Sequence, residues 1–123
     1  MRLRGRVASG IGDLTKWMLP NREVYAAATG EDLYPGSLNV VLDVPWFVPA
    51  GAQRLEPSDF RVGGVGMSIV PCAINGLPAF ILRSDRNNAG IGNHPPTVIE
   101  VAASVRLRDA LALADGDEVV VDV

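Results

Sequence analysis

The stretch Tyr34-Pro35-Gly36-Ser37-Leu38-Asn39-Val40 places a tight turn directly before an extended segment. Proline presets φ and glycine tolerates positive φ, so Pro35-Gly36 suits the centre of a type II turn. The apolar run continues through Val41 and Leu42. The stretch therefore predicts a turn followed at once by a β-strand.

The predicted strand carries polar side chains on one face only. Side chains alternate along a strand, so Leu38, Val40 and Leu42 are expected to enter a core, while Ser37 and Asn39 share the opposite face, roughly 7 Å apart. Two neutral oxygens placed in this way can hold a hard cation such as Mg²⁺, with water and phosphate completing the shell. On spacing alone, turn capping is the commoner use of serine and asparagine here.

Length and composition indicate a single domain, residues 1–123, with its own core. Such a chain buries roughly two-thirds of its unfolded surface. Cys72 and His94 are the only cysteine and histidine, which excludes a metal cage built from these residues. No run approaches the roughly 18 apolar residues of a membrane span, and no signal-peptide core is evident. We therefore expect a cytoplasmic protein.

The charge balance argues against nucleic acid as a partner. The formal net charge is −3 and the pI is near 5.0, whereas nucleic-acid binding normally leaves a basic footprint. The arginines are nevertheless grouped locally, as in the pairs Arg83 with Arg86 and Arg106 with Arg108. Such small groups favour a small phosphate-bearing ligand over a polymer.

Alternation and turn signals predict about six strands and two short helices. The expected strands are 2–9, 38–42, 66–74, 78–82, 97–102 and 118–123, and Asn75-Gly76 is a strong hairpin signal between the third and the fourth. Asn21 and Ser104 are expected to cap helices 22–29 and 105–113. Residues 83–96 are expected to form a long loop. This pattern is typical of a mainly β domain, either a small barrel or a sandwich.

The ordered motifs resemble the archaeal CTP-dependent riboflavin kinase family. The family signature runs Pro-x-Gly-Thr-Leu-Asn, and this chain reads Tyr34-Pro35-Gly36-Ser37-Leu38-Asn39 in its place, with Ser37 for threonine. Residues 5–13 resemble its opening strand and glycine loop, and 98–102, 106–108 and 113–119 resemble its closing third. The resemblance implies a small six-stranded Greek-key barrel of the cradle-loop type, with one or two short helices.

The resemblance also implies an activity and a set of site residues. The activity is transfer of the γ-phosphoryl group of CTP to the 5′-hydroxyl of riboflavin, giving FMN and CDP. Mg²⁺ would be held by Ser37 and Asn39, and Glu100 would contact the flavin, orient the attacking hydroxyl and accept its proton. Gly92 stands at the family's flavin-contacting threonine. The implied nucleotide-binding residues are Gly10, Ile11, Gly12, Asp13, Leu14, Thr15, Val105, Arg106, Leu107 and Arg108.

The chain departs from the family at two of these positions. Leu14 replaces the third glycine of the loop, and Gly92 lacks the threonine hydroxyl. One alternative is therefore a barrel that binds flavin or nucleotide without turnover. Another is a structural or DNA-binding barrel, because residues 113–123 resemble the terminal hairpin of such domains. A donor other than CTP stays open, as does the oligomeric state.

Overall fold

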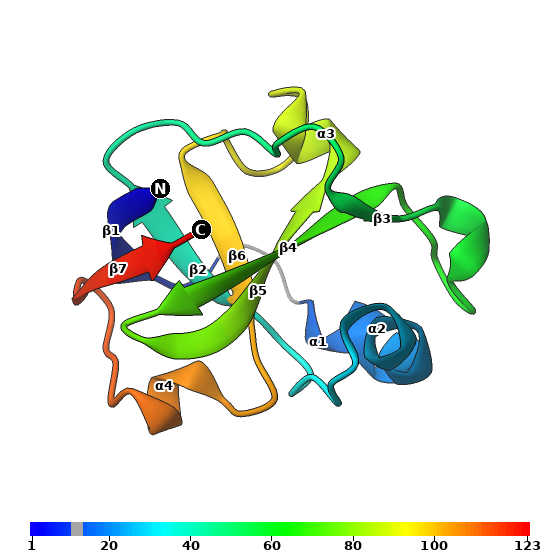
Figure 1. Ribbon diagram of the computed structural model, residues 1–123, viewed down its shortest axis with the longest axis horizontal. Coiled ribbons are helices and arrows are strands. Elements are labelled where there is room, and N and C mark those ends of the chain that lie inside the picture. Colours follow the sequence, from blue (N-terminus) through cyan, green and yellow to red (C-terminus); the bar gives the residue numbers. More distant parts are fainter. Residues whose placement is uncertain (11–13) are drawn as a thin grey trace.

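One antiparallel sheet closes on itself to form a barrel (Figure 1). The computed structural model describes residues 1–10 and 14–123. Within them the strand order is β3-β4-β5-β6-β2-β1-β7, and a further pairing of β4 with β7 closes six strands into a ring to which β3 adds an edge. This confirms the predicted mainly β, six-stranded barrel. The strands are β1 (Arg2–Ala8), β2 (Leu38–Leu42), β3 (Gln53–Leu55), β4 (Met67–Ile74), β5 (Leu77–Ser84), β6 (Val98–Ala102) and β7 (Glu118–Asp122).

Strand β2 has the predicted two faces. Leu38, Val40 and Leu42 are buried in the main core, Val40 completely, while Val41 is 40% exposed. Asn39, on the outer face, is nevertheless buried. Strand β1 crosses β2 so closely that a Cβ on Gly5 would lie 2.5 Å from the carbonyl oxygen of Val41, so only glycine fits there.

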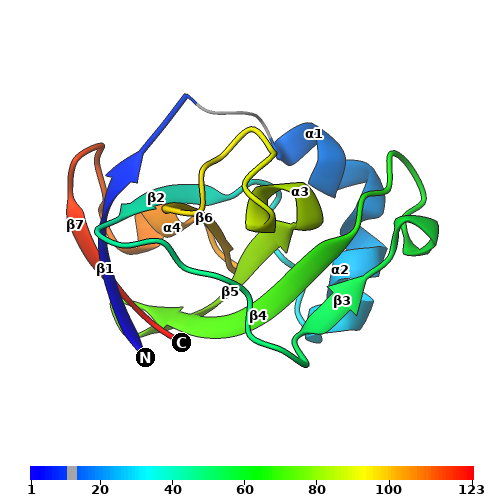
Figure 2. The same cartoon turned by 90° about the horizontal axis from the view of Figure 1, so that it is seen from above.

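The two chain ends lie together on the barrel wall. Strand β1 pairs with β7, and the Met1 ammonium group donates to the Val123 carbonyl oxygen at 2.9 Å. Figures 1 and 2 both show the ends side by side, on the opposite side of the barrel from the helices that follow β1. Within the described residues, no helix is long and apolar enough to span a membrane.

The helical segment at residues 15–29 covers one end of the barrel, around a second apolar cluster (Figure 1). Met18, Tyr25 and Leu33 pack there against Leu55, Met67, Ile69, Leu82 and Ala102. Four α-helical segments occur within the described residues, more than the one or two predicted. They are α1 (Thr15–Met18), α2 (Arg22–Thr29), α3 (Asp85–Asn88) and α4 (Leu107–Ala110), and two 3₁₀ turns span Leu19–Asn21 and Pro57–Asp59.

Helix α2 has the predicted bounds but not the predicted cap. It ends at Thr29, and the residue at its C-cap is Gly30, whose φ is 76°. Asn21 makes no capping bond, because its amide nitrogen donates to the carbonyl oxygens of Trp17 (2.8 Å) and Val62 (2.9 Å) and its oxygen accepts from the Arg61 backbone N–H (2.8 Å). Tertiary contacts thus use the side chain to fasten α2 to the 61–62 segment.

The predicted helix at 105–113 and the predicted loop at 83–96 need correction. Helix α4 spans only Leu107–Ala110, and Arg106 rather than Ser104 stands at its N-cap position. Strand β5 extends through Ser84, and the short helix α3 follows it directly. The Ser84 hydroxyl caps α3 by accepting from the backbone N–H of Asn87 at 3.1 Å. The hairpin at Asn75-Gly76 is confirmed, with φ of 47° and 83°.

Candidate functional site

Two hollows adjoin at the paired strands β2 and β6. Asn39 on β2 lines the first hollow, and its register partner on β6, Glu100, lines the second. Leu14 lines both hollows. The first hollow is formed by residues 14–15, 34–39, 101–103 and 105–108, and the second by Leu14, Trp17, 65–67, 84–87, 92–94 and Glu100.

The first hollow brings together two segments that are far apart in the sequence. The predicted metal ligands Ser37 and Asn39 share its wall with most of the predicted nucleotide-binding residues, namely Leu14, Thr15, Val105, Arg106, Leu107 and Arg108. Gly10 is exposed at the end of β1, with φ of 90°, and does not line the hollow. Ile11, Gly12 and Asp13 of the predicted loop lie outside the described residues. Ligand binding at all these positions stays a prediction.

The two arginines beside α4 have different partners. Arg106 pairs with Asp109 at 2.7 Å on the exposed side of the helix. Arg108 pairs with Asp115 at 2.7 Å and also donates to the carbonyl oxygen of Ala8, at the end of β1. Exposed ion pairs contribute little to stability, so Arg106 can leave Asp109 for an incoming anion at small cost. Arg108 ties the turn at 115 to the start of the glycine loop.

Asp115 connects Arg108 to the end of β1 through two hydrogen bonds. It accepts hydrogen bonds from the Ser9 hydroxyl and from Arg108. These two contacts hold the pKa of the Asp115 carboxyl below its usual value. The ionised carboxylate therefore fixes the last described residues before the glycine loop.

The donor set at Ser37 and Asn39 fits Mg²⁺. A hydroxyl and an amide oxygen are hard donors, and Mg²⁺ usually keeps several waters and phosphate oxygens instead of a full protein cage. Within the described residues no cluster of three or more His, Cys, Asp or Glu side chains could hold a metal ion. The site therefore suits a metal that arrives with phosphate.

The second hollow contains a carboxyl group that is mostly withdrawn from water. The Glu100 side chain is 14% exposed, and burial raises its pKa to about 7 against the opposing effect of the Arg83 charge. The Nε2 atom of His94 lies 3.3 Å from Glu100 Oε1. Burial, with the positive charge of Arg83, lowers the pKa of His94. Sequence reasoning used His94 only to exclude a metal cage and missed this contact.

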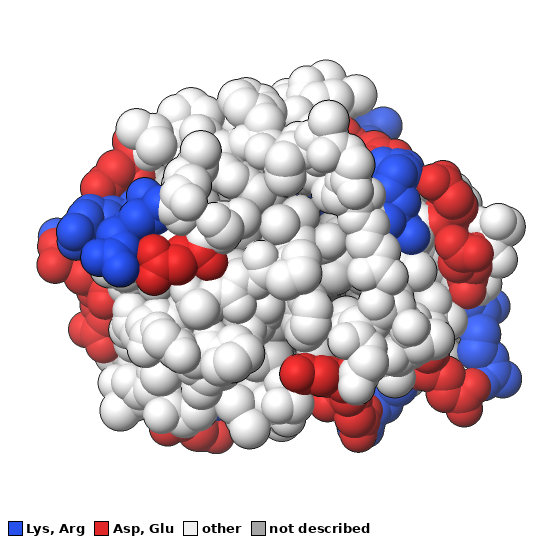
Figure 3. All heavy atoms as spheres, viewed as in Figure 1, with Lys and Arg blue, Asp and Glu red and all other residues white. Residues whose placement is uncertain are grey.

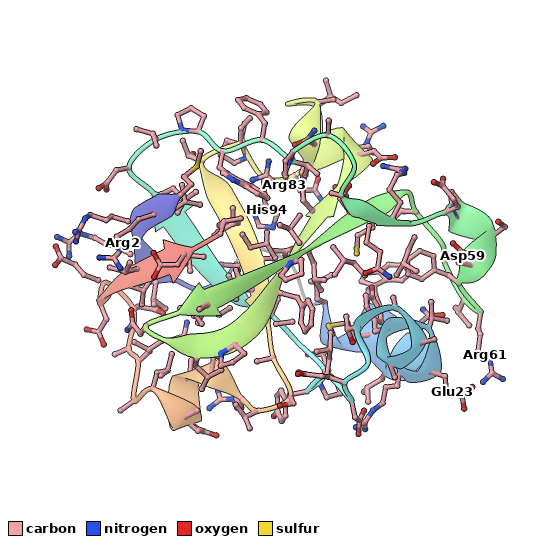
Figure 4. The ribbon with its side chains drawn as sticks, viewed as in Figure 1. Arg2, Glu23, Asp59, Arg61, Arg83 and His94 are labelled. Carbon is pink, nitrogen blue, oxygen red and sulfur yellow. The ribbon has the colours of Figure 1, made fainter. Side chains whose placement is uncertain are left out.

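Arg83 supports the fold and does not offer a phosphate-binding group. This corrects the interpretation from the sequence, in which Arg83 and Arg86 form a local group that favours a phosphate-bearing ligand. Its side chain is buried, and it donates to the carbonyl oxygens of Trp46 (2.9 Å), Pro96 (3.2 Å) and Val98 (3.2 Å). The guanidinium also lies 5.3 Å from the centre of the Trp46 ring. Figure 4 shows Arg83 and His94 inside the molecule, whereas the labelled Arg2, Glu23, Asp59 and Arg61 lie at its edge.

The two departures from the family pattern have local structural reasons. A Cβ on Gly92 would lie 1.9 Å from Asn87 Oδ1, so the Asn87 amide takes the space that a threonine would need. That oxygen accepts from the backbone N–H of His94 at 3.2 Å. Leu14 packs against the second apolar cluster, between the two hollows. Both positions are thus built into this chain's own packing.

Charged side chains stand in mixed groups on the face shown in Figure 3. Arg2 pairs with Asp122 at 2.9 Å, and Arg6 pairs with Glu118 at 2.7 Å. Arg54 pairs with Asp85 at 2.8 Å. Because both signs of charge stand together on the face in Figure 3, it shows no continuous basic surface, and the expected lack of nucleic-acid binding stays a prediction.

Comparison with known proteins identifies relatives over nearly the whole chain. The family model CTP-dep_RFKase, described as a domain of unknown function (DUF120), matches residues 7–123. Riboflavin kinase of Methanocella arvoryzae is 37% identical over 123 residues, covering 95% of this chain and 54% of the relative. Riboflavin kinase of Pyrobaculum aerophilum is 35% identical over 135 residues, covering 100% and 60%. The chain thus spans little more than half the length of these relatives.

Proposed function

Since the chain belongs to the CTP-dependent riboflavin kinase family, we propose that it transfers the γ-phosphoryl group of CTP to the 5′-hydroxyl of riboflavin. The products are FMN and CDP. The observation that carries the proposal is the register of β2 and β6, which sets Asn39 in one hollow beside Glu100 in the next. A phosphate donor and an alcohol acceptor held in adjoining hollows can meet at that strand pair.

The first hollow is assigned to the nucleotide. Its wall offers backbone groups of the 34–39 turn and the guanidinium of Arg106, which can turn from Asp109 to a phosphate. Ser37 and Asn39 would hold Mg²⁺ there, and the ion when bound would neutralise charge on the phosphate oxygens. Phosphoryl transfer depends mostly on positioning and charge stabilisation, so a site with few strong catalytic groups is sufficient.

The second hollow is assigned to the flavin. Leu14, Trp17, Val65 and Met67 give it an apolar wall suited to a flat ring, and Glu100 lies at the boundary with the first hollow. As the 5′-oxygen forms its bond to phosphorus and the bond to the departing CDP oxygen breaks, the hydroxyl proton passes to the Glu100 carboxylate. A base whose pKa is about 7 suits this step near neutral pH.

A donor panel tests the proposal. Protein, riboflavin and Mg²⁺ are incubated separately with CTP, ATP, GTP and UTP, and FMN is measured by chromatography. We expect FMN with CTP, and none without Mg²⁺. FMN formed only with another nucleotide would keep the kinase and replace the donor, whereas no FMN with any donor would reject the kinase.

The second candidate function, binding without turnover, is favoured by Leu14 and Gly92 alone. It predicts that riboflavin fluorescence changes on addition of protein although no donor yields FMN. The same samples used in the donor panel report this change. Riboflavin binding without FMN would therefore select the second candidate directly.

A further inference from the structure

His94 is the one buried ionisable residue of the second hollow that the proposed function leaves without a role. Its side chain is 6% exposed, and its Nε2 atom is 3.3 Å from the carboxyl oxygen of Glu100. Its other nitrogen, Nδ1, is buried and makes no hydrogen bond to the described residues. Within the described residues, the contact with Glu100 is thus the only polar contact of the ring.

The loop around His94 is held from α3. The Ser84 hydroxyl caps the helix at Asn87, and the Asn87 side-chain oxygen accepts from the His94 backbone N–H. Gly92 leaves room for that oxygen, because any Cβ there would collide with it. The absence of a side chain at 92 therefore secures the position of His94.

The surroundings select one form of the imidazole ring. With the proton on Nε2, the ring presents a donor to the Glu100 carboxylate, whereas a proton on Nδ1 would set a lone pair against it. An imidazolium would add a buried N–H without an acceptor, and its charge would be repelled by Arg83. Besides His94, the charged or titratable groups that act on Glu100 are Arg83 and Tyr25.

We propose that His94 is a positioning residue, whose Nε2–H holds one carboxyl oxygen of Glu100 so that the other receives the hydroxyl of the acceptor. This role rests on the proposed function. A carboxylate with two free oxygens can rotate away from the substrate, and a fixed donor on one oxygen removes that freedom. His94 acts through Glu100 and does not touch the reacting atoms.

The first test needs no turnover. His94 is the only histidine in the chain, so ¹⁵N-histidine labelling of untagged protein gives imidazole signals from this residue alone. At pH 8 we expect a single tautomer protonated at Nε2, with an Nε2 signal that shifts in Glu100→Gln and stays unchanged in the control Cys72→Ala. A proton on Nδ1, or a signal indifferent to Glu100→Gln, would overturn the proposal.

The second test separates positioning from folding. His94→Leu should lower kcat by about tenfold, with little change in KM for the nucleotide, because only the base is affected. His94→Gln restores an amide N–H near the Nε2 position and should recover most of the loss. His94→Leu added to Glu100→Gln should cost nothing further, since both changes act on one group.

The two tests have distinguishable failures. Equal losses in His94→Leu and His94→Gln, or an additive loss in the double variant, would overturn the positioning role while the kinase stands. If the wild-type protein forms no FMN with any donor, the kinase fails. The imidazole spectra still decide in that case whether His94 holds Glu100.

Discussion

Asn39 combines burial with a place on the wall of the first hollow. Its strand register follows from alternation in the sequence, because Leu38 and Val40 must enter the core. The polar side chain is thereby directed away from that core, toward the segments at 14–15 and 105–108. One position thus joins strand formation to the proposed binding of metal and phosphate.

Asn39→Ala should abolish Mg²⁺-dependent turnover and leave the barrel intact. Loss of a fixed oxygen at the phosphates is expected to cost about a hundredfold or more in kcat. FMN formation across a Mg²⁺ titration, with a thermal melt as the check on folding, measures this. Asn39→Asp keeps an oxygen donor and should retain activity at higher levels than Asn39→Ala, and full activity in the alanine variant would remove the metal assignment.

Glu100 should make stability depend on pH in the direction opposite to a salt-bridged carboxylate. Burial raises its folded pKa to about 7, above the unfolded value near 4.5. Between these values the folded protein keeps a proton that the unfolded chain releases, so stability is lost as pH rises. Relative to Glu100→Gln, the wild-type free energy of unfolding should fall by about 3 kcal/mol from pH 4.5 to 8.

Urea denaturation at several pH values measures this difference. Glu23→Gln is the control, because it makes the same chemical change at a side chain that is 84% exposed. Parallel curves for Glu100→Gln and the wild type would show that Glu100 is no more protonated in the folded protein than in the unfolded chain.

At the scale of elements, the barrel strands and the bounds of α2 were predictable from the sequence, whereas the helix caps and the shorter helices were not. Alternation and turn signals together indicated all six barrel strands, and Asn75-Gly76 fixed the β4–β5 hairpin, because these signals are local. The Asn21 cap was wrong because the side chain bonds to a segment 40 residues away. Helix α3 was missed because four polar residues give no apolar period.

In the candidate site too, features with a local sequence signal were predictable, and features that depend on tertiary contacts were not. The Pro-Gly-Ser-Leu-Asn stretch and residues 105–108 were selected from sequence and do line one hollow. The contact of His94 with Glu100 depends on how the 89–97 segment returns from α3 to β6, and no short pattern encodes that path. Arg83 was misjudged because its strand continues beyond the predicted end and directs the side chain inward.

Leu14, at the start of α1, stands where the family has the third glycine of the loop. Substitutions at this position test whether the leucine side chain narrows the first hollow. Its backbone is right-handed helical, with φ of −67°, so the side chain and not the backbone distinguishes it from glycine here. Leu14→Gly removes that side chain from the walls of both hollows and should increase CDP affinity, measured by calorimetry. Weaker binding would show that the leucine is part of the nucleotide site.

Leu14→Ala is the matched control for that experiment. It removes most of the side chain without adding the backbone freedom of glycine, which costs about 1 kcal/mol in a helix. Equal affinities for the two variants would assign the effect to bulk. A gain only in the glycine variant would assign it to loop flexibility.

At the scale of the whole molecule, the barrel is closed by contacts that local patterns do not reveal. Strand β4 meets β7 through the register pairs Ala73 with Asp122 and Ile74 with Val121, nearly 50 residues apart in sequence. The choice between barrel and sandwich therefore could not be made from strand patterns. It came from the family resemblance, which the closed strand order confirms.

Val121 should be the position where a small change weakens the entire barrel. It is fully buried, and it pairs with Leu3 on β1 as well as with Ile74 on β4, so it joins both sides of the closing strand. Val121→Ala should lower the free energy of unfolding by about 2 kcal/mol, from lost burial and the cavity left behind. Val41→Ala makes the same chemical change on the outward face of β2, where the side chain is 40% exposed, and should cost under about 0.5 kcal/mol.

Urea midpoints at constant slope measure both variants. Equal losses would mean that closure at β7 contributes no more to stability than an outward strand position, and the barrel would then have to be held by its other five strands.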